Sequence, residues 1–116
     1  MKIFNELKTM ELTEEQCDFT KGRLIQEAML IDGKKEYVWI YTLFTTKELY
    51  ENEISDIKFW FETEYREMFE KCTRRINLGI LMKDGQSPQT VLAELYAKAE
   101  NNASRIHTLE ALISSL

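Results

Sequence analysis

Side chains that could serve as nucleophile or base in catalysis are few in this chain. It contains one histidine, His107, and two cysteines, Cys17 and Cys72. Cys72 falls on the apolar side of an expected helix, where loss of water would raise the pKa of its thiol and make it a poorer nucleophile. A catalytic thiol also needs a base and a group that orients the base. The only nucleophile–base pair that the chain could form is His107 with a cysteine brought close to it by the fold. We expect no enzyme activity.

Metal and cofactor motifs are missing from the sequence as well. There is no Cys-x-x-Cys, no His-x-x-x-His and no Asp-rich calcium loop. A Glu-x-x-His pair would need a glutamate three residues before His107, and Ser104 stands there. The four glycines are isolated, so no glycine-rich turn leads into a helix as a phosphate cradle would require. We expect neither a metal nor a cofactor.

Composition indicates an ordinary globular protein. The chain has 116 residues, 44% of them hydrophobic and 30% charged, enough for one core without metal or disulfide support. The formal net charge of −5 argues against direct binding of a nucleic-acid backbone. No apolar run approaches the roughly 18 residues that cross a membrane, and the first residues lack the apolar core of a signal peptide. We expect a single domain, 1–116, in the cytoplasm, with no membrane contact and with both cysteines reduced.

The element around which the chain is organised is an amphipathic helix over Glu51–Ile76. Apolar residues recur there with steps of three and four, as on one side of a helix with about 3.6 residues per turn. Phe59 and Trp60 lie off this apolar stripe, so they are either covered by another part of the chain or contact a partner. The stripe consists of Ile54, Ile57, Phe61, Tyr65, Met68, Cys72 and Ile76.

A short helix is predicted from Thr13 to Lys21. Thr13-Glu14-Glu15-Gln16 has the pattern of a capping box, in which Thr13 and Gln16 satisfy each other's backbone N–H groups. Gly22 offers a matching stop, because glycine readily adopts the left-handed conformation just past a helix end. The segment before this helix, Met1–Met10, is either an edge strand or a helical turn.

A β-hairpin is predicted next. Two apolar runs, Leu24–Ile31 and Tyr37–Phe44, flank Asp32-Gly33, a dipeptide typical of the tight hairpin turn that needs positive φ. The alternative is one continuous helix from Thr13 to Asp32, because several residues of the first run favour helices, and it would make the protein an all-α bundle.

The expected hairpin is apolar on both faces, with Tyr37, Trp39 and Tyr41 in a row on one of them. A strand with one face in water should alternate apolar and polar residues. Both faces must therefore be covered, and a second subunit is the simplest cover.

The last helix is predicted to begin at Ser87-Pro88, with serine as the N-cap and proline in the first turn. Apolar residues then occupy two heptad positions over four repeats, which is typical of helix–helix packing, either with Glu51–Ile76 or with another copy. Asn102 interrupts this seam, either as a buried residue that fixes the register or as a residue in contact with water. The seam consists of Leu92, Leu95, Ala99, Asn102, Ile106, Leu109, Ile113 and Leu116.

We predict an α+β fold that is predominantly helical: a short N-terminal helix, a β-hairpin, and two long amphipathic helices packed together. The surplus of apolar surface and the lack of catalytic motifs indicate a non-catalytic interaction or regulatory protein, which binds another protein and self-associates as a homo-oligomer. The residues expected at such interfaces are Tyr37, Trp39, Tyr41, Phe59, Trp60, Leu95, Asn102, Ile106, Leu109 and Ile113.

Two other functions stay open. One is an acidic inhibitor that occupies the nucleic-acid-binding site of a target protein, with carboxylates in place of phosphates; interspersed cations weaken it, because a mimic should present one sign of charge. The other is a small-molecule-binding module, with its ligand held by Tyr37, Trp39, Tyr41 and Tyr65. The cations that interrupt the acidic surface are expected to form the i,i+4 ion pairs Glu62–Arg66, Glu67–Lys71 and Glu70–Arg74.

Overall fold

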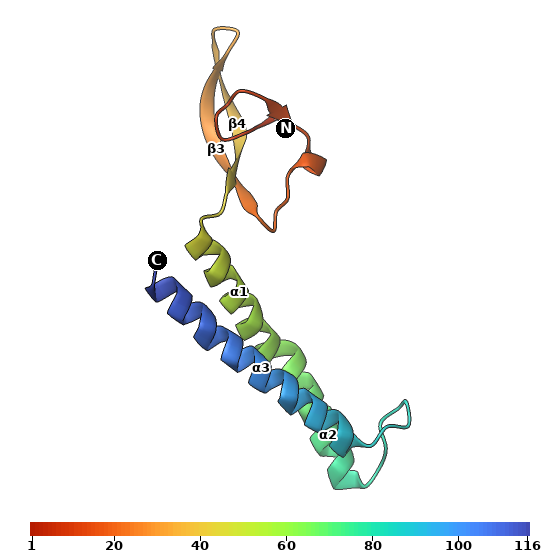
Figure 1. Cartoon of the computed structure of the whole chain (residues 1–116). Coiled ribbons are helices and arrows are strands. Elements are labelled where there is room, and N and C mark those ends of the chain that lie inside the picture. The colour runs from red at the N-terminus through yellow and green to blue at the C-terminus, as the bar shows by residue number, and fades with distance from the viewer. The chain divides into compact units, whose positions relative to one another are not determined.

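Four strands form one mixed sheet in the computed structural model, which describes residues 1–116 (Figure 1). The sheet belongs to one compact unit, Met1–Leu49, and a second unit, Tyr50–Leu116, is helical. The expected mixture of α and β structure is confirmed, whereas the expectation of one domain stays a prediction. The strands lie in the order β2-β1-β4-β3, with β1 (Ile3–Phe4), β2 (Glu11–Leu12), β3 (Gly22–Ile31) and β4 (Lys34–Leu43).

The predicted hairpin is present as the antiparallel pair β3–β4. Asp32 and Gly33 connect the strands with φ angles of 51° and 76°, the positive values that a two-residue hairpin turn needs. The all-α bundle and the continuous helix through Asp32 are therefore wrong. The register places Tyr41 opposite Leu24 and Tyr37 opposite Ala28, so the residues share faces as the alternation predicted.

The predicted helix over Thr13–Lys21 is wrong, because only a single 3-10 turn, η1 (Glu14–Gln16), forms there. Gln16 does reach back, and its Oε1 accepts a hydrogen bond from the Thr13 N–H at 2.8 Å. After this turn the chain is extended at Cys17, and the Asp18 carboxylate accepts from the backbone N–H of Thr20 at 2.9 Å. Such local bonds from an aspartate compete with a helix, and the residues after Gln16 are weak helix formers.

The core of the sheet unit is small. It consists of Ile3, Cys17, Val38 and Ile40, all nearly inaccessible to water. Strand β1 lies parallel to β4 and pairs Ile3 with Trp39, so the N-terminal segment extends the sheet beside the middle of β4. The other edge of the sheet, strand β3, has no neighbour beyond β4.

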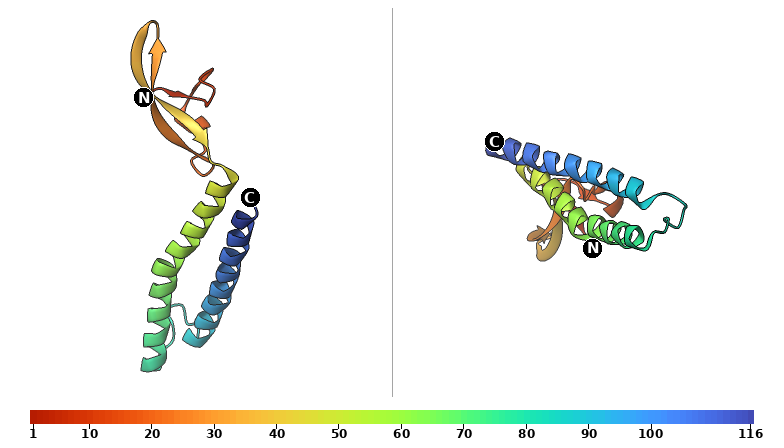
Figure 2. Two further views of the ribbon diagram at one scale, coloured as in Figure 1. Left: turned by 90° about the vertical axis from the view of Figure 1, so that its left-hand side faces the viewer. Right: turned by 90° about the horizontal axis from the view of Figure 1, so that it is seen from below.

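Two long helices form the second unit, as predicted for this part of the chain. α1 (Thr46–Trp60), η2 (Phe61–Tyr65) and α2 (Arg66–Leu78) make one continuous helix, and α3 (Pro88–Ser114) runs back beside it (Figure 2). The Ser87 hydroxyl caps α3 by accepting from the Thr90 N–H at 3.4 Å. With no N-terminal helix, the protein has two long helices rather than the three helices predicted.

The seam between these helices contains the predicted apolar stripes. Cys72 from α2 and Leu109 from α3 are fully buried, and the other stripe residues are half-buried, apart from the exposed terminal Leu116. The heptads of α3 therefore pack within the chain, which the sequence had left open. Asn102 is half-buried, and no buried side-chain polar atom lacks a hydrogen bond. Since Asn102 makes no hydrogen bond within the chain, its amide stays in contact with water.

Candidate interaction surfaces

A chain of aromatic rings crosses the helical unit around η2. We call Trp60, Phe61, Tyr65, Phe69 and Tyr96 the aromatic ladder. Neighbouring ring centroids lie 4.9 Å apart for Trp60–Phe61, 5.5 Å for Phe61–Tyr65, 6.1 Å for Tyr65–Phe69 and 6.4 Å for Phe69–Tyr96. These separations are in the range in which aromatic pairs attract beyond their buried area. The ladder joins the first long helix to α3 through Tyr96.

A π-helical turn positions the first rings of the ladder. η2 spans Phe61–Tyr65, and a π turn has more residues per turn than an α-helix, so it rotates the residues that follow. The Thr63 hydroxyl donates to the Phe59 carbonyl at 2.7 Å and so satisfies a backbone oxygen at the start of this turn. Trp60, expected off the stripe, is half-buried under the Lys98 ammonium, 5.0 Å from its ring centroid. Phe59 is 65% exposed.

The far end of the ladder is open to solvent. Phe69 is 37% exposed and Tyr96 is 46% exposed. Beside them lies a shallow groove on α3, lined by Phe61, Tyr96 and the small side chains of alanines 93, 97, 99 and 103, together with the carboxylate of Glu100. Exposed aromatic rings therefore lie next to a groove in which the small alanine side chains leave room for the side chains of a partner.

The aromatic row predicted on the hairpin is only partly exposed. Tyr37 is 70% exposed, with the Lys35 ammonium over its ring, and Trp39 is half-buried. Tyr41 is held in place, because its hydroxyl donates to the Asp18 carbonyl and its ring meets Phe19 edge-on. The three rings do not form one open platform.

The four heptad residues predicted as interface candidates lie in or near the seam. Leu109 is fully buried there, and Leu95, Ile106 and Ile113 are half-buried. Their apolar surface is used mainly within the chain. Together with Asn102 they form the inner side of the helical unit, whereas the ladder continues onto its outer surface.

Ion pairs neutralise part of the acidic surface of the first long helix. Glu53 binds Arg105 of α3 through two hydrogen bonds of 2.6 and 3.3 Å, and this contact raises the pKa of the Arg105 guanidinium. Glu67 pairs with Lys71 at 3.2 Å, as predicted. The predicted pairs of Arg66 with Glu62 and of Arg74 with Glu70 do not form.

The chemical groups singled out in the sequence are not assembled into a reactive site. Burial raises the pKa of the Cys72 thiol, as its place on the stripe predicted. His107 is exposed, and no group of three or more metal-ligating side chains occurs. None of the helices has the length and apolarity to span a membrane. Comparison with protein families, curated proteins and solved structures found no match.

Sequence reasoning missed two features of the helical unit. The first is the π turn, which brings the ring of Trp60 close to the other rings of the ladder. The only signal of this turn in the sequence is the cluster of aromatic residues at positions 59–61. The other is a cationic hollow beside the loop after α2, lined in part by Lys83. The cations of α2 were visible in the sequence, but the path of the loop was not.

Proposed function

We propose that this is a non-catalytic interaction protein that binds other protein surfaces and self-associates through the aromatic ladder. The observation that carries the proposal is the exposure of Phe69 and Tyr96 at the end of a continuous row of rings. Exposed, contiguous aromatic surface is enriched at protein interfaces, and aromatic residues provide much of their binding energy.

The architecture of the helical unit supports this proposal. Two packed helices bury one stripe each and leave their flanks without a second layer. Besides Pro88, only Cys72 and Leu109 are fully enclosed in this unit. A further pair of helices on the flank would complete a four-helix arrangement, in which every helix has two neighbours.

A second copy of the chain is the partner that fits the ladder. The rings of Phe61 and Tyr96 lie beside small residues such as Ala93 and Ala97 in the same groove. A two-fold axis brings the same patch of both copies together, so that the rings of each meet the small side chains of the other. Such a surface is self-complementary without any further element.

Light scattering on a size-exclusion column tests the proposal. The chain has a mass of 13.8 kDa, and we expect a multiple of this mass that persists on dilution and between low and high salt, because apolar contacts are not screened. Phe69→Ala and Tyr96→Ala should each weaken association by about 30-fold, the equivalent of a hot-spot loss of about 2 kcal/mol. Circular dichroism checks that the variants stay helical.

Phe59→Ala is the matched control, because it removes the same side chain from an exposed position outside the ladder. We expect it to leave the mass unchanged. A monomer at every concentration would refute self-association. Dissociation by Phe59→Ala, with no effect of Phe69→Ala or Tyr96→Ala, would move the interface away from the ladder.

A further inference from the structure

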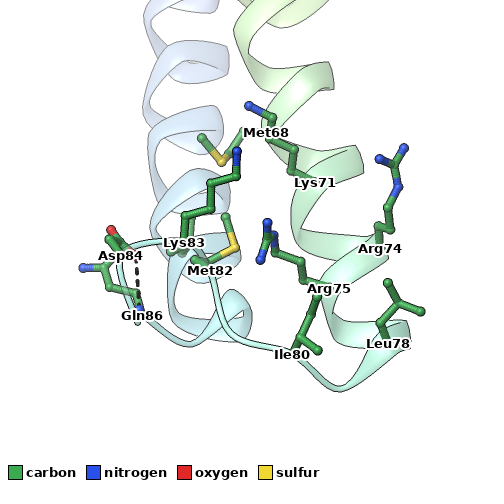
Figure 3. Close-up of a pocket in the computed structure, with 11 residues that line it drawn as sticks. Met68, Lys71, Arg74, Arg75, Leu78, Ile80, Met82, Lys83, Asp84 and Gln86 are labelled. Carbon is green, nitrogen blue, oxygen red and sulfur yellow. Dashed lines mark hydrogen bonds between the residues drawn. The ribbon is translucent and has the colours of Figure 1, made fainter.

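A hollow of about 560 Å³ lies between the second half of α2, the loop that follows it and the first turn of α3 (Figure 3). This volume is within the range of sites that hold small molecules. The hollow lies entirely within the helical unit. It is separate from the aromatic ladder, and its interpretation does not depend on self-association.

The loop that lines one side of this hollow is held in place by hydrogen bonds. Gly79 ends α2 with φ of 69°, and the Ile80 N–H donates to the Arg75 carbonyl at 3.0 Å, as in a Schellman motif. The Arg75 guanidinium in turn donates to the Leu81 carbonyl. The Met82 N–H donates to the Gln86 carbonyl at 2.9 Å and closes the tip of the loop. These bonds fix the wall opposite α2.

Cationic side chains converge in the hollow. Lys71, Lys83 and Arg75 line the hollow and project on the side of α2 that faces α3, whereas Arg74 points to the outer side of the helix (Figure 3). Asp84 is the one acid in the lining, and its carboxylate accepts from the Gln86 N–H at 3.1 Å. Outside the lining, the exposed Glu67 pairs with the Lys71 ammonium at 3.2 Å, in a contact open to water that a bound anion would replace. The lining, with four cations and one acid, therefore has a formal charge of +3.

This concentration of positive charge stands out against the rest of the protein. The whole chain has a net charge of −5, so the residues outside a lining of +3 carry −8. The helix macrodipole accounts for cations in the last turns of α2. It does not account for Lys83, which lies in the loop beyond the helix end and lines the same hollow as Lys71 and Arg75.

The floor of the hollow is apolar. Met68 of α2, Met82 of the loop and Val91 of α3, all half-buried, contribute to it, and Ile80 of the loop lines the hollow from a more exposed position. Methionine side chains are flexible and polarizable, so they adapt to ligands of irregular shape. A cationic rim over an apolar floor selects molecules that carry a compact negative charge on an apolar body.

We propose that this hollow binds a small organic anion of the phosphomonoester class, with an apolar group attached to the phosphate. Lys71, Lys83 and Arg75 together with Asp84 carry a net charge of +2, which a dianionic phosphate compensates in full and a carboxylate only by half. Arginine can donate two hydrogen bonds to one phosphate, and lysine binds it as a point charge. The apolar substituent covers the methionine floor and displaces its water.

Isothermal titration calorimetry with phenyl phosphate tests this assignment on the full chain. We expect saturable binding with a dissociation constant below about 1 mM. The double variant Lys71→Gln/Lys83→Gln should weaken it at least about tenfold, and Arg75 is left in place because it holds the loop. The matched control, Lys58→Gln/Arg66→Gln, removes the same charge from exposed positions of the same long helix and should bind as the unaltered protein does.

Three binding results would overturn the proposal. They are the absence of saturable phenyl phosphate binding, equal weakening in both double variants, and inorganic phosphate binding as tightly as phenyl phosphate. In a ¹H–¹⁵N NMR spectrum, phenyl phosphate should shift the amides of residues 79–87 in the unaltered protein and the control. Shifts confined to other parts of the chain would also contradict the site, whatever the affinity.

Discussion

Truncation of Leu109 is expected to destabilise the helical unit more than truncation of any exposed leucine of α3. Leu109 is fully buried in the seam. Leu109→Ala removes three carbon groups, about 2.4 kcal/mol at about 0.8 kcal/mol each, and the cavity that remains raises the cost to about 2.7–5 kcal/mol. Leu112 of the same helix is 37% exposed, so Leu112→Ala should cost about 1.5 kcal/mol at most and leave no closed cavity.

Urea unfolding followed by circular dichroism measures both variants. A unit of this size has a total stability of only about 3–10 kcal/mol, so Leu109→Ala should shift the midpoint strongly and populate the unfolded state in dilute urea. All proteins are compared at one concentration, because self-association would add to the apparent stability. If Leu109→Ala costs less than about 1 kcal/mol, or no more than Leu112→Ala, the burial of this end of α3 within the chain is refuted.

Two further substitutions test local features of the structure. Gly22→Ala should destabilise the sheet unit by about 1–3 kcal/mol, because a Cβ there would lie 2.7 Å from the Thr42 carbonyl oxygen and 2.8 Å from the fixed ring of Tyr41. Hydrogen exchange of the β3 and β4 amides measures this loss of stability. Unchanged protection of these amides would contradict the prediction. The raised pKa of Cys72 means that the folded state keeps its proton to higher pH than the unfolded state. Its contribution to stability is therefore complete below the ordinary thiol value of 9.0 and declines as pH rises through the folded pKa. The free energy of unfolding should fall less between neutral and alkaline pH in Cys72→Ala than in the unaltered protein, and an equal fall in urea titrations would contradict the burial of this thiol.

Elements with a local cause could be predicted from the sequence. The hairpin follows from the turn chemistry of Asp32-Gly33, and the start of α3 follows from Ser87-Pro88. The start of α1 carries a complete capping box, in which the Thr45 N–H donates to Glu48 at 3.1 Å and the Glu48 N–H donates to the Thr45 hydroxyl at 3.2 Å. In each case the signal lies within a few residues of its effect.

The N-terminal segment shows why local signals are not sufficient. Thr13 and Gln16 form their capping contact, but a cap lowers the cost of starting a helix without extending it. The burial of Cys17 and the bond of the Tyr41 hydroxyl to Asp18 draw the next residues toward the hairpin instead. The bond between Tyr41 and Asp18 joins residues 23 positions apart, and the pairing of Ile3 with Trp39 is longer still.

The candidate sites divide in the same way. The position of Phe59 off the apolar stripe could be read from the sequence, and its 65% exposure agrees with that, but Phe59 lies outside the ladder. That Lys83 and Lys71 line one hollow depends on how the loop folds back, and the link from Phe69 to Tyr96 depends on the register of two helices. Neither has a signature in a single stretch of sequence, because each joins residues from two elements.

Self-association and anion binding should be independent of each other. Phe69 of the ladder and Lys71 of the hollow are two residues apart, which is about 200° around a helix, so they face opposite sides of α2. Phenyl phosphate should therefore leave the mass measured by light scattering unchanged, and Phe69→Ala should leave the affinity for phenyl phosphate unchanged. If phenyl phosphate instead alters the mass measured by light scattering, the two binding events are energetically coupled. The half-buried seam, which lies between the two sides of α2, would then transmit that coupling.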